Sequence, residues 1–142
     1  MRYAFTIPVH PIPKARPRVM KGYTYTPKRT VSAEKVVRAA ALAAGAKPLG
    51  GPVRLSVRFY RGDARPCDLD NLAKLVQDAL NGVAWKDDRQ IVWLAASKQI
   101  DRERPRTEVV VETDRAGELA WDDGWKPSEP PSAGKDLEAG PA

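Results

Sequence analysis

One stretch of the chain constrains the fold more than any other, because a helix pattern lies between two strand patterns. From about Asp70 to Asn81, apolar residues recur at helical spacing and form one stripe, and Gly82 is a natural helix end. Residues 53–60 before it alternate between apolar and polar side chains, and residues 90–99 after it also indicate a strand. The sequence therefore predicts a strand–helix–strand unit at the centre of the chain.

Further elements on both sides complete an α+β domain. Residues 2–9 alternate and predict a strand, Tyr23 to Thr26 predicts a short one, and residues 106–112 predict a last one. Thr30 is expected to cap an alanine-rich helix over about 31–45. We expect a mixed β-sheet with two main helices packed on it.

Composition excludes several kinds of catalytic site. The chain has 142 residues, the size of one domain, and it contains one cysteine, Cys67, and one histidine, His10. These counts exclude an internal disulfide and a zinc site built from several Cys and His ligands. His10 lies in a Pro-rich stretch, which makes it a poor partner for a catalytic Ser or Cys. No apolar run approaches the length of a membrane span, and we expect neither a membrane partner nor a nucleotide cofactor. If the protein is an enzyme, its chemistry must come from carboxylates, lysine and a hard metal ion.

The charge of the chain is unevenly distributed. Residues 1–112 contain 21 Lys and Arg against 11 Asp and Glu, whereas residues 113–142 contain 3 against 7. Seven basic residues and no acidic residue precede Glu34, most of them in or after a predicted loop over His10 to Gly22. Such a stripe is typical of a surface that binds a polyanion, although a solubilising surface has the same composition. The candidate DNA contacts are Lys14, Arg16, Arg18, Lys21, Lys28 and Arg29.

The final segment differs in composition from the rest. Residues 113–142 carry four prolines, four glycines and few apolar side chains, which predicts a disordered acidic tail after a domain of residues 1–112. Trp121 and Trp125 are one helical turn apart and could dock on that domain. An acidic tail can also compete with nucleic acid for a basic surface.

Four aspartates and a lysine form the constellation with chemical potential. Asp68 and Asp70 are placed where a predicted strand ends and a helix begins, and Asp87 and Asp88 follow that helix. Carboxylates that come close together repel one another unless a divalent cation supplies the missing charge, and Mg²⁺ prefers such oxygen ligands. If the two flanking strands are neighbours, the chain can return Asp88 toward the first pair. Lys74, one turn after Asp70, can neutralise charge on a phosphate.

Each of these signals also has a purely structural interpretation. Asp70 is a favoured residue type for a helix N-cap, and Asp87 with Asp88 could be an ordinary loop pair. Lys74 could simply pair with Asp70 or Asp78 along the helix. Taken together with the basic N-terminal region, the constellation favours metal-dependent phosphodiester chemistry on nucleic acid.

At these residues the sequence resembles the RusA family of Holliday-junction resolvases of bacteria and their phages. The resemblance covers most of residues 1–112, in order and with compatible spacing, and the block from Asp68 to Asp88 is its specific part. The residues that carry it are Lys14-Ala15-Arg16-Pro17-Arg18, Tyr25-Thr26-Pro27-Lys28, Asp68-Leu69-Asp70-Asn71-Leu72 with Lys74, Asp78-Ala79-Leu80-Asn81-Gly82, Trp85-Lys86-Asp87-Asp88, and Lys98.

The resemblance implies a small homodimeric endonuclease that needs Mg²⁺ or Mn²⁺ and resolves four-way DNA junctions by paired symmetric nicks. It places the family's essential carboxylates on Asp68, Asp70 and Asp88 and its essential lysine on Lys74, with Asp87 as an additional candidate. We therefore expect the three carboxylates to hold one or two metal ions and Lys74 to stabilise charge during cleavage. A role in DNA recombination and repair in the bacterial cytoplasm, for a cell or a phage, follows from the same resemblance.

Two other functions remain compatible with the residues. One is a metal-dependent nuclease that acts on other branched DNA, and the other is a DNA-binding module without catalysis, in which the carboxylates only shape a surface. A two-fold dimer suits a four-way junction because both have the same symmetry. Tyr23 and Tyr25 could stack on an unpaired base near a branch point, although packing in the core is the more usual role of tyrosine.

Overall fold

The predicted strand–helix–strand unit is present in the computed structural model of the protein. It consists of β4 (Val53–Arg61), α2 (Leu69–Leu80) and β5 (Ile91–Ile100), and each lies within about one residue of its predicted range. The strands β4 and β5 pair in parallel, so α2 crosses back between them over one face of the sheet. The two strands therefore run in the same direction, and the start of β5 lies beside the start of β4.

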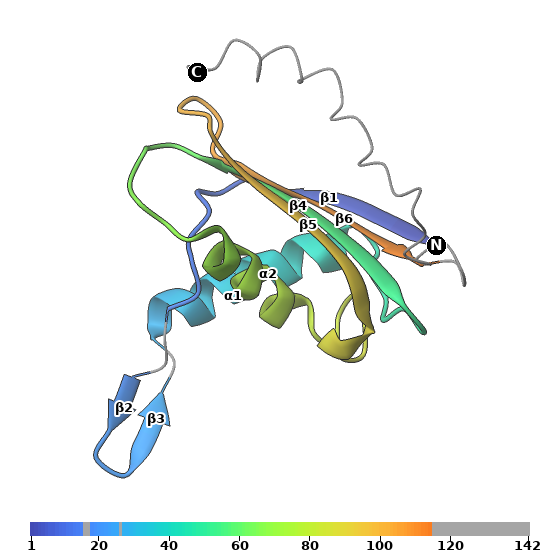
Figure 1. Ribbon diagram of the computed structural model, residues 1–142, viewed down its shortest axis with the longest axis horizontal. Helices are drawn as coiled ribbons and strands as arrows, with labels where there is room; N and C mark the ends of the chain where they lie inside the picture. The colour runs from blue at the N-terminus through green and yellow to red at the C-terminus, as the bar shows by residue number, and fades with distance from the viewer. Residues whose placement is uncertain (16–17, 26, 115–142) are drawn as a thin grey trace, which may run out of the picture.

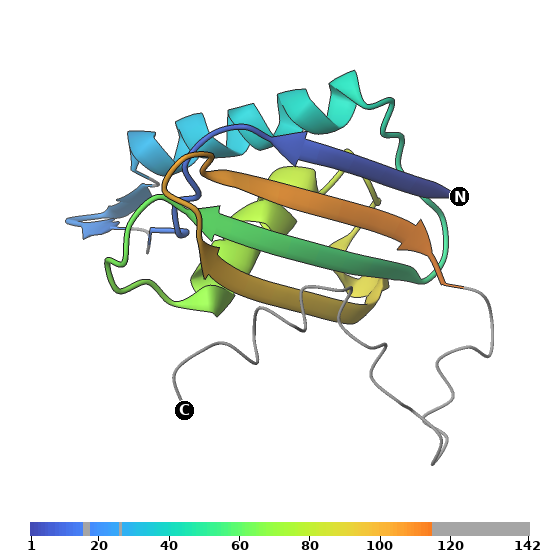
Figure 2. The same cartoon turned by 90° about the horizontal axis from the view of Figure 1, so that it is seen from above.

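The remaining strands extend the sheet on the other side of β4. Its order is β1-β6-β4-β5, in which β6 (Arg106–Thr113) pairs antiparallel with both β4 and β1 (Arg2–Ile7). α1 (Lys28–Ala43) and α2 cover the same face of this sheet (Figures 1 and 2). The structure confirms the expected α+β class, a mixed sheet with two main helices packed on it.

The structure describes residues 1–15, 18–25 and 27–114. The predicted acidic tail, with Trp121 and Trp125, lies outside these residues, except for Thr113 in β6 and Asp114. The main-chain N–H of Asp114 donates to the carbonyl of Pro52. Of the helices in the described residues, none is both long enough and apolar enough to cross a bilayer.

A short hairpin replaces part of the predicted loop over His10 to Gly22. β2 (Arg18–Met20) pairs antiparallel with β3 (Tyr23–Tyr25), and the hairpin projects from the body at the end where α1 begins (Figure 1). Gly22 makes the turn possible with a φ of 89°, which side chains other than glycine rarely adopt. β2 has only three residues, which are too few for an alternating pattern to predict a strand from the sequence. Tyr23 is 60% exposed and so does not pack in the core.

The first helix begins earlier than its sequence predicts. It starts at Lys28 directly after Pro27, and Thr30 lies inside its first turn rather than at the cap. The Thr30 hydroxyl is buried and accepts a hydrogen bond from the main-chain N–H of Ala15, at 3.3 Å. A residue outside the helix therefore uses the oxygen that was expected to cap it. The helix ends with Gly45 in the left-handed region, where a following N–H returns to Ala41 as in a Schellman motif.

The core lies between the helices and one face of the sheet. Alternate side chains of β4 are buried, and the apolar stripe of α2 packs against them. Trp85 is completely buried although it lies in the predicted loop between α2 and β5. Burial of one aromatic side chain stabilises a fold by roughly 1.5–3 kcal/mol, so this loop contributes to the core as an element does. Its backbone pairs with Leu49 and Asn81.

Lys14 connects the N-terminal loop to both helices. Its ammonium contacts the carboxylates of Glu34 in α1 and Asp78 in α2, the latter at 3.1 Å, and its main-chain N–H donates to the carbonyl of Asn71. Burial opposes the charge of Lys14, but the hydrogen bonds to Glu34 and Asp78 outweigh it and raise the pKa of the ammonium above its usual 10.5. The folded state therefore stabilises the charged lysine.

Replacing Lys14 by Met is expected to lower the free energy of unfolding by about 1–2 kcal/mol, because it removes the cation that Glu34 and Asp78 share and leaves Asp78 only its weak pair with Lys74. Chemical denaturation measures this loss, and the exposed Lys21→Met is the matched control. Because the folded-state pKa is the higher one, the difference between wild type and variant is expected to persist up to about pH 10 and to shrink above it. Equal stability of the variant and the wild type at pH 7 contradicts the connection.

Candidate active site

An open groove lies between the start of α2 and the edge strand β5. It has a volume of about 460 Å³ and is lined by Asp68, Leu69, Asp70, Ala73, Leu94 and Ala96. Asp68 is the residue before α2 and Asp70 is in its first turn, so the helix holds the two carboxylates on one side of the groove. Negative charge there is also favourable to the helix dipole. We call this feature the acidic groove.

Neither carboxylate of the acidic groove caps the helix. Asp68 occupies the N-cap position but makes no capping hydrogen bond, and Asp70 follows within the helix, so the interpretation of Asp70 as the cap is wrong. Asn71 donates to one oxygen of each aspartate, at 3.3 Å to Asp68 and 3.0 Å to Asp70. Within the described part of the chain, the second oxygen of each carboxylate has no protein donor and remains available to a ligand.

Lys74 and Asp78 follow the acidic pair along the same polar face of α2. The Lys74 ammonium is 3.5 Å from an Asp78 oxygen and its side chain is 57% exposed. Asp78 also contacts Lys14, which identifies it as a structural carboxylate. An exposed i,i+4 pair is weak, at roughly 0.3–0.5 kcal/mol, so Lys74 can leave Asp78 for a phosphate at small cost.

Asp88 lies at the other end of the strand–helix–strand unit. It begins the short 3-10 helix η1 (Asp88–Gln90) directly before β5, and its Oδ1 accepts a hydrogen bond from the buried indole of Trp85 at 2.9 Å. Trp85 pairs with the backbone at the C-terminal end of α2. Because α2 has twelve residues, it separates the two ends by about 18 Å. Neighbouring strands alone therefore do not return Asp88 to Asp68 and Asp70.

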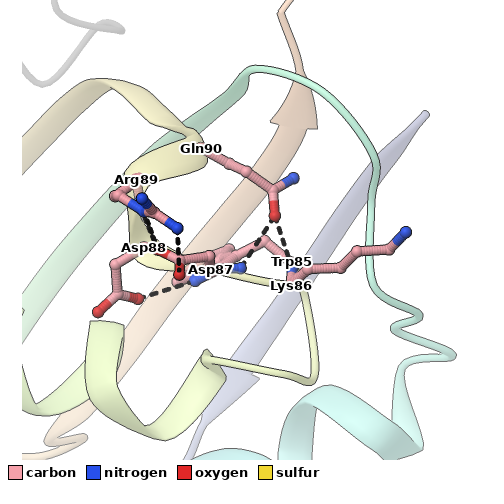
Figure 3. Close-up of polar contacts among 6 residues, drawn as sticks. All are labelled: Trp85, Lys86, Asp87, Asp88, Arg89 and Gln90. Atoms are coloured by element: carbon pink, nitrogen blue, oxygen red, sulfur yellow. Dashed lines mark hydrogen bonds and ion pairs between the residues drawn. The ribbon is translucent and has the colours of Figure 1, made fainter.

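Asp87 and Gln90 hold the turn that carries Asp88 (Figure 3). Asp87 accepts from the main-chain N–H of Arg89, and this hydrogen bond, with the Arg89 side chain, lowers the pKa of its carboxyl below the usual value. The Gln90 carboxamide oxygen accepts from the N–H groups of Lys86 and Asp87, and its nitrogen donates to two carbonyls of the loop before β4. Asp87 therefore has a capping role in this structure, and sequence reasoning did not identify Gln90.

The expected cluster of three carboxylates does not form within one chain. Over residues 1–15, 18–25 and 27–114, no three His, Cys, Asp or Glu side chains lie close enough together to hold a metal ion. The acidic groove nevertheless offers a suitable donor set for Mg²⁺, because that ion is commonly held by one or two carboxylates and keeps several waters. Asp68 and Asp70, each with one free oxygen, fit this requirement.

The predicted DNA-binding residues fall into two groups. Lys21, Lys28 and Arg29 are exposed, Lys21 in the turn of the hairpin and the other two in the first turn of α1. That turn contains no acidic residue, so cations occupy the end of a helix that favours anions. Lys14 is instead engaged with Glu34 and Asp78. Arg16 and the side chain of Arg18 lie outside the part that the structure describes.

Comparison with known proteins finds a family and a relative that match most of the chain. The model of the family described as endodeoxyribonuclease RusA matches residues 8–112, which is most of the chain. The chain is also 32% identical over 133 residues to the uncharacterized protein YqaN of Bacillus subtilis (strain 168). That match covers 75% of this chain and 93% of the relative.

Replacing Gln90 by Leu tests whether its carboxamide holds the Asp88 turn. The substitution removes the partners of four main-chain groups, and we expect a loss of about 2–4 kcal/mol in the free energy of unfolding. Chemical denaturation measures it, and Arg89→Ala, at a neighbouring side chain that is 90% exposed, is expected to keep near wild-type stability. If both variants are equally stable, Gln90 does not support the turn.

Proposed function

The chain belongs to the RusA endodeoxyribonuclease family, and we propose that it cleaves DNA four-way junctions in a reaction that requires Mg²⁺ or Mn²⁺. The observation that carries the proposal is the acidic groove, in which Asp68 and Asp70 are open to solvent, neither caps the helix, and each keeps one oxygen without a protein donor. Family membership supports the junction-resolving nuclease class. The metal, the paired nicks and the dimer are proposals that rest on Asp68, Asp70, Lys74 and Asp88.

Each side chain of the acidic groove has a role that follows from its position. Asp68 and Asp70 would hold the divalent cation through their free oxygens, and Lys74 would pair with the phosphate to be cut. When bound, the metal would supply Lewis acidity at the phosphate and would lower the pKa of a water that it holds. Lys74 contributes because it is exposed, lies one turn beyond Asp70 and is only weakly held by Asp78. A cation that contacts the phosphate would stabilise the extra negative charge of the transition state.

The exposed cations at the same end of the molecule suit a DNA strand that leads to the groove. The hairpin and the start of α1 lie at the end of the molecule where α2 also begins (Figures 1 and 2). The hydrogen bond from Lys14 to the carbonyl of Asn71 ties the loop before the hairpin to α2. Lys21, Lys28 and Arg29 would contact phosphates without reading sequence, so binding should depend strongly on salt.

We further propose that a second copy of the chain supplies Asp88. Within one chain α2 keeps Asp88 away from the acidic pair, but β5 is an edge strand whose outer edge has no partner in the described part of the chain. Val92 and Leu94 on this strand are apolar and 44% and 46% exposed. An unpaired edge with exposed apolar residues is suited to pairing with another chain.

A two-fold axis near Val92, midway along the chain between Asp88 and Ala96 of the groove, would complete the site. Such an axis runs the two β5 strands antiparallel, so the residues just before β5 in one copy lie opposite the middle of β5 in the other. Asp88 of one protomer then approaches the groove of the partner subunit, and each dimer has two equivalent sites. Two sites related by two-fold symmetry match the two strands that junction resolution must nick. This symmetry favours a four-way junction over a flap or a linear duplex as the substrate.

Replacing Asp70 by Asn is expected to reduce cleavage of a synthetic four-way junction at least a hundredfold while leaving junction affinity largely unchanged, because the amide keeps the shape but loses the charge. Cleavage gels and fluorescence anisotropy measure the two quantities. Glu103→Gln, the same chemical change at an exposed turn, serves as the matched control. EDTA should abolish wild-type cleavage, and excess Mg²⁺ or Mn²⁺ should restore it. Full activity of Asp70→Asn, or activity that is indifferent to EDTA, refutes the proposed chemistry.

The same assay on a four-way junction, a flap and a linear duplex identifies the substrate. We expect paired nicks in the junction and little cleavage of the duplex. Preferential cleavage of the flap would instead favour a nuclease for other branched DNA. Binding of the junction without any cleavage in either metal would favour a non-catalytic module.

Mixing two inactive variants tests whether the site is shared between subunits. In a mixed dimer of Asp70→Asn and Asp88→Asn chains, one shared site has both changes and the other has neither. We therefore expect nicking of one strand to return after the two proteins are unfolded and refolded together, although each alone is inactive. If each chain contains its own complete site, every site in the mixture carries one change and no activity returns.

A further inference from the structure

A second, basic pocket lies beside the acidic groove. It has a volume of about 240 Å³ and its lining includes Arg61, Asp63, Arg65, Lys98 and Gln99. The pocket is formed by the end of β4, the loop that follows it and the end of β5, which lie together in Figures 1 and 2. Three of the lining side chains are cationic and one is anionic. We call this feature the basic pocket.

Arg61 is the unusual residue of the basic pocket. It continues the buried row of alternate β4 side chains after Phe59, at a position where an apolar residue is expected, and it is only 7% exposed. Its Nη1 donates to the carbonyl of Arg65 at 2.7 Å, while its buried Nε has no hydrogen-bond partner among the described residues. A buried guanidinium that is incompletely paired is unfavourable unless an anion comes to it.

The acidic side chains nearby are committed elsewhere. Asp63 accepts from the main-chain N–H of Arg65, forms an ion pair with the Arg65 side chain, and lies 3.8 Å from Nε2 of His10. Asp101, whose main-chain N–H donates to the carbonyl of Arg61, has its carboxylate paired with Arg106 at 2.8 Å. Neither carboxylate forms a hydrogen bond or an ion pair with Arg61 in the described part of the chain. Arg61 therefore has no directly paired carboxylate, and the three cations of the pocket outnumber its one carboxylate, Asp63.

The basic pocket and the acidic groove are directly connected. Lys98 lines the pocket, and its ammonium donates to the carbonyl of Cys67, the residue before Asp68. Along β5, Lys98 is two residues beyond Ala96, which lines the groove, and points to the same face of the sheet at a distance of roughly 6.6 Å. A DNA strand with a phosphate at Asp68 and Asp70 would therefore also lie close to the basic pocket.

We propose that the basic pocket binds a phosphate group through Arg61 and Lys98, and that the DNA backbone supplies it from a position next to the phosphate that is cut. The inference rests on the proposed nuclease function, which it refines with a second phosphate position. Arg61 is a fixed, planar donor because packing holds its side chain, whereas the exposed Lys98 adjusts to the ligand. The pair would set the register of the strand, so that the correct phosphodiester lies over the acidic groove.

The test neutralises the charge on each side of this contact. Wild type and Arg61→Met are compared, in the Asp70→Asn background that blocks cleavage, on junctions in which one phosphate at a time is replaced by a neutral methylphosphonate. At the position beside the cut, we expect the neutral phosphate to weaken wild-type binding about tenfold or more. Arg61→Met should bind the unmodified junction with a similar loss of affinity. The methylphosphonate at that position should then weaken its binding little further. Lys98→Gln provides a second variant at an exposed position, in case Arg61→Met folds poorly.

The controls separate this site from general electrostatics and from a free anion. Arg58→Met changes an exposed arginine on the opposite face of β4, and it should leave the methylphosphonate effect intact. If the affinity loss from the methylphosphonate multiplies with the loss from the substitution, in both Arg61→Met and Lys98→Gln, the proposed phosphate contact is wrong. If inorganic phosphate stabilises wild type but not Arg61→Met, and no methylphosphonate weakens binding, the pocket binds free phosphate and the DNA source is wrong. If wild type binds junctions but cuts none in Mg²⁺, the nuclease function fails while the phosphate contact is still measurable by affinity.

Discussion

The parallel pairing of β4 with β5 determines where each acidic side chain of the candidate site lies. A helix that joins two parallel strands must cross from the end of the first to the start of the second. Asp68 and Asp70, before and within the first turn of that helix, therefore lie at one end of the unit, and Asp88, before β5, lies at the other. An antiparallel pair of strands would have brought the two groups together in one chain. The direction of a single strand pair thus makes the dimer, in our proposal, a chemical requirement.

Much of the fold can be predicted from local patterns in the sequence. The stripe of α2 and the alternation of β4 predict these elements to within about a residue, because each packs one face against the core. Trp85 and Gln90 are different. Trp85 is buried in a segment without periodicity, and Gln90 bonds to main-chain groups about 40 residues away. Neither relation leaves a repeating signal, so only the folded chain reveals it.

The sequence predicts those parts of the site whose residues are close neighbours along the chain. Asp68 and Asp70 are two residues apart, and their exposure follows from their place before and at the start of a helix. The position of Asp88 depends on strand direction, which spacing does not encode. Lys14 belongs to the same basic run as Lys21, yet it pairs with two carboxylates from distant parts of the chain. Arg61 does leave a signal, because it breaks the apolar side of the β4 alternation at its last position.

The placement of cations around the acidic groove resolves a conflict in its chemistry. Two carboxylates that are open to solvent attract a divalent cation but also repel the phosphates of DNA. Two groups of cations counter this repulsion, Lys21, Lys28 and Arg29 at the hairpin and α1, and those of the basic pocket at the end of β4 and β5. Both groups belong to the end of the molecule where α2 begins, so we propose that a strand held by them also reaches the acidic groove. The carboxylates then meet a phosphate whose approach the cations have already made favourable, which is the condition under which metal-dependent cleavage can be selective.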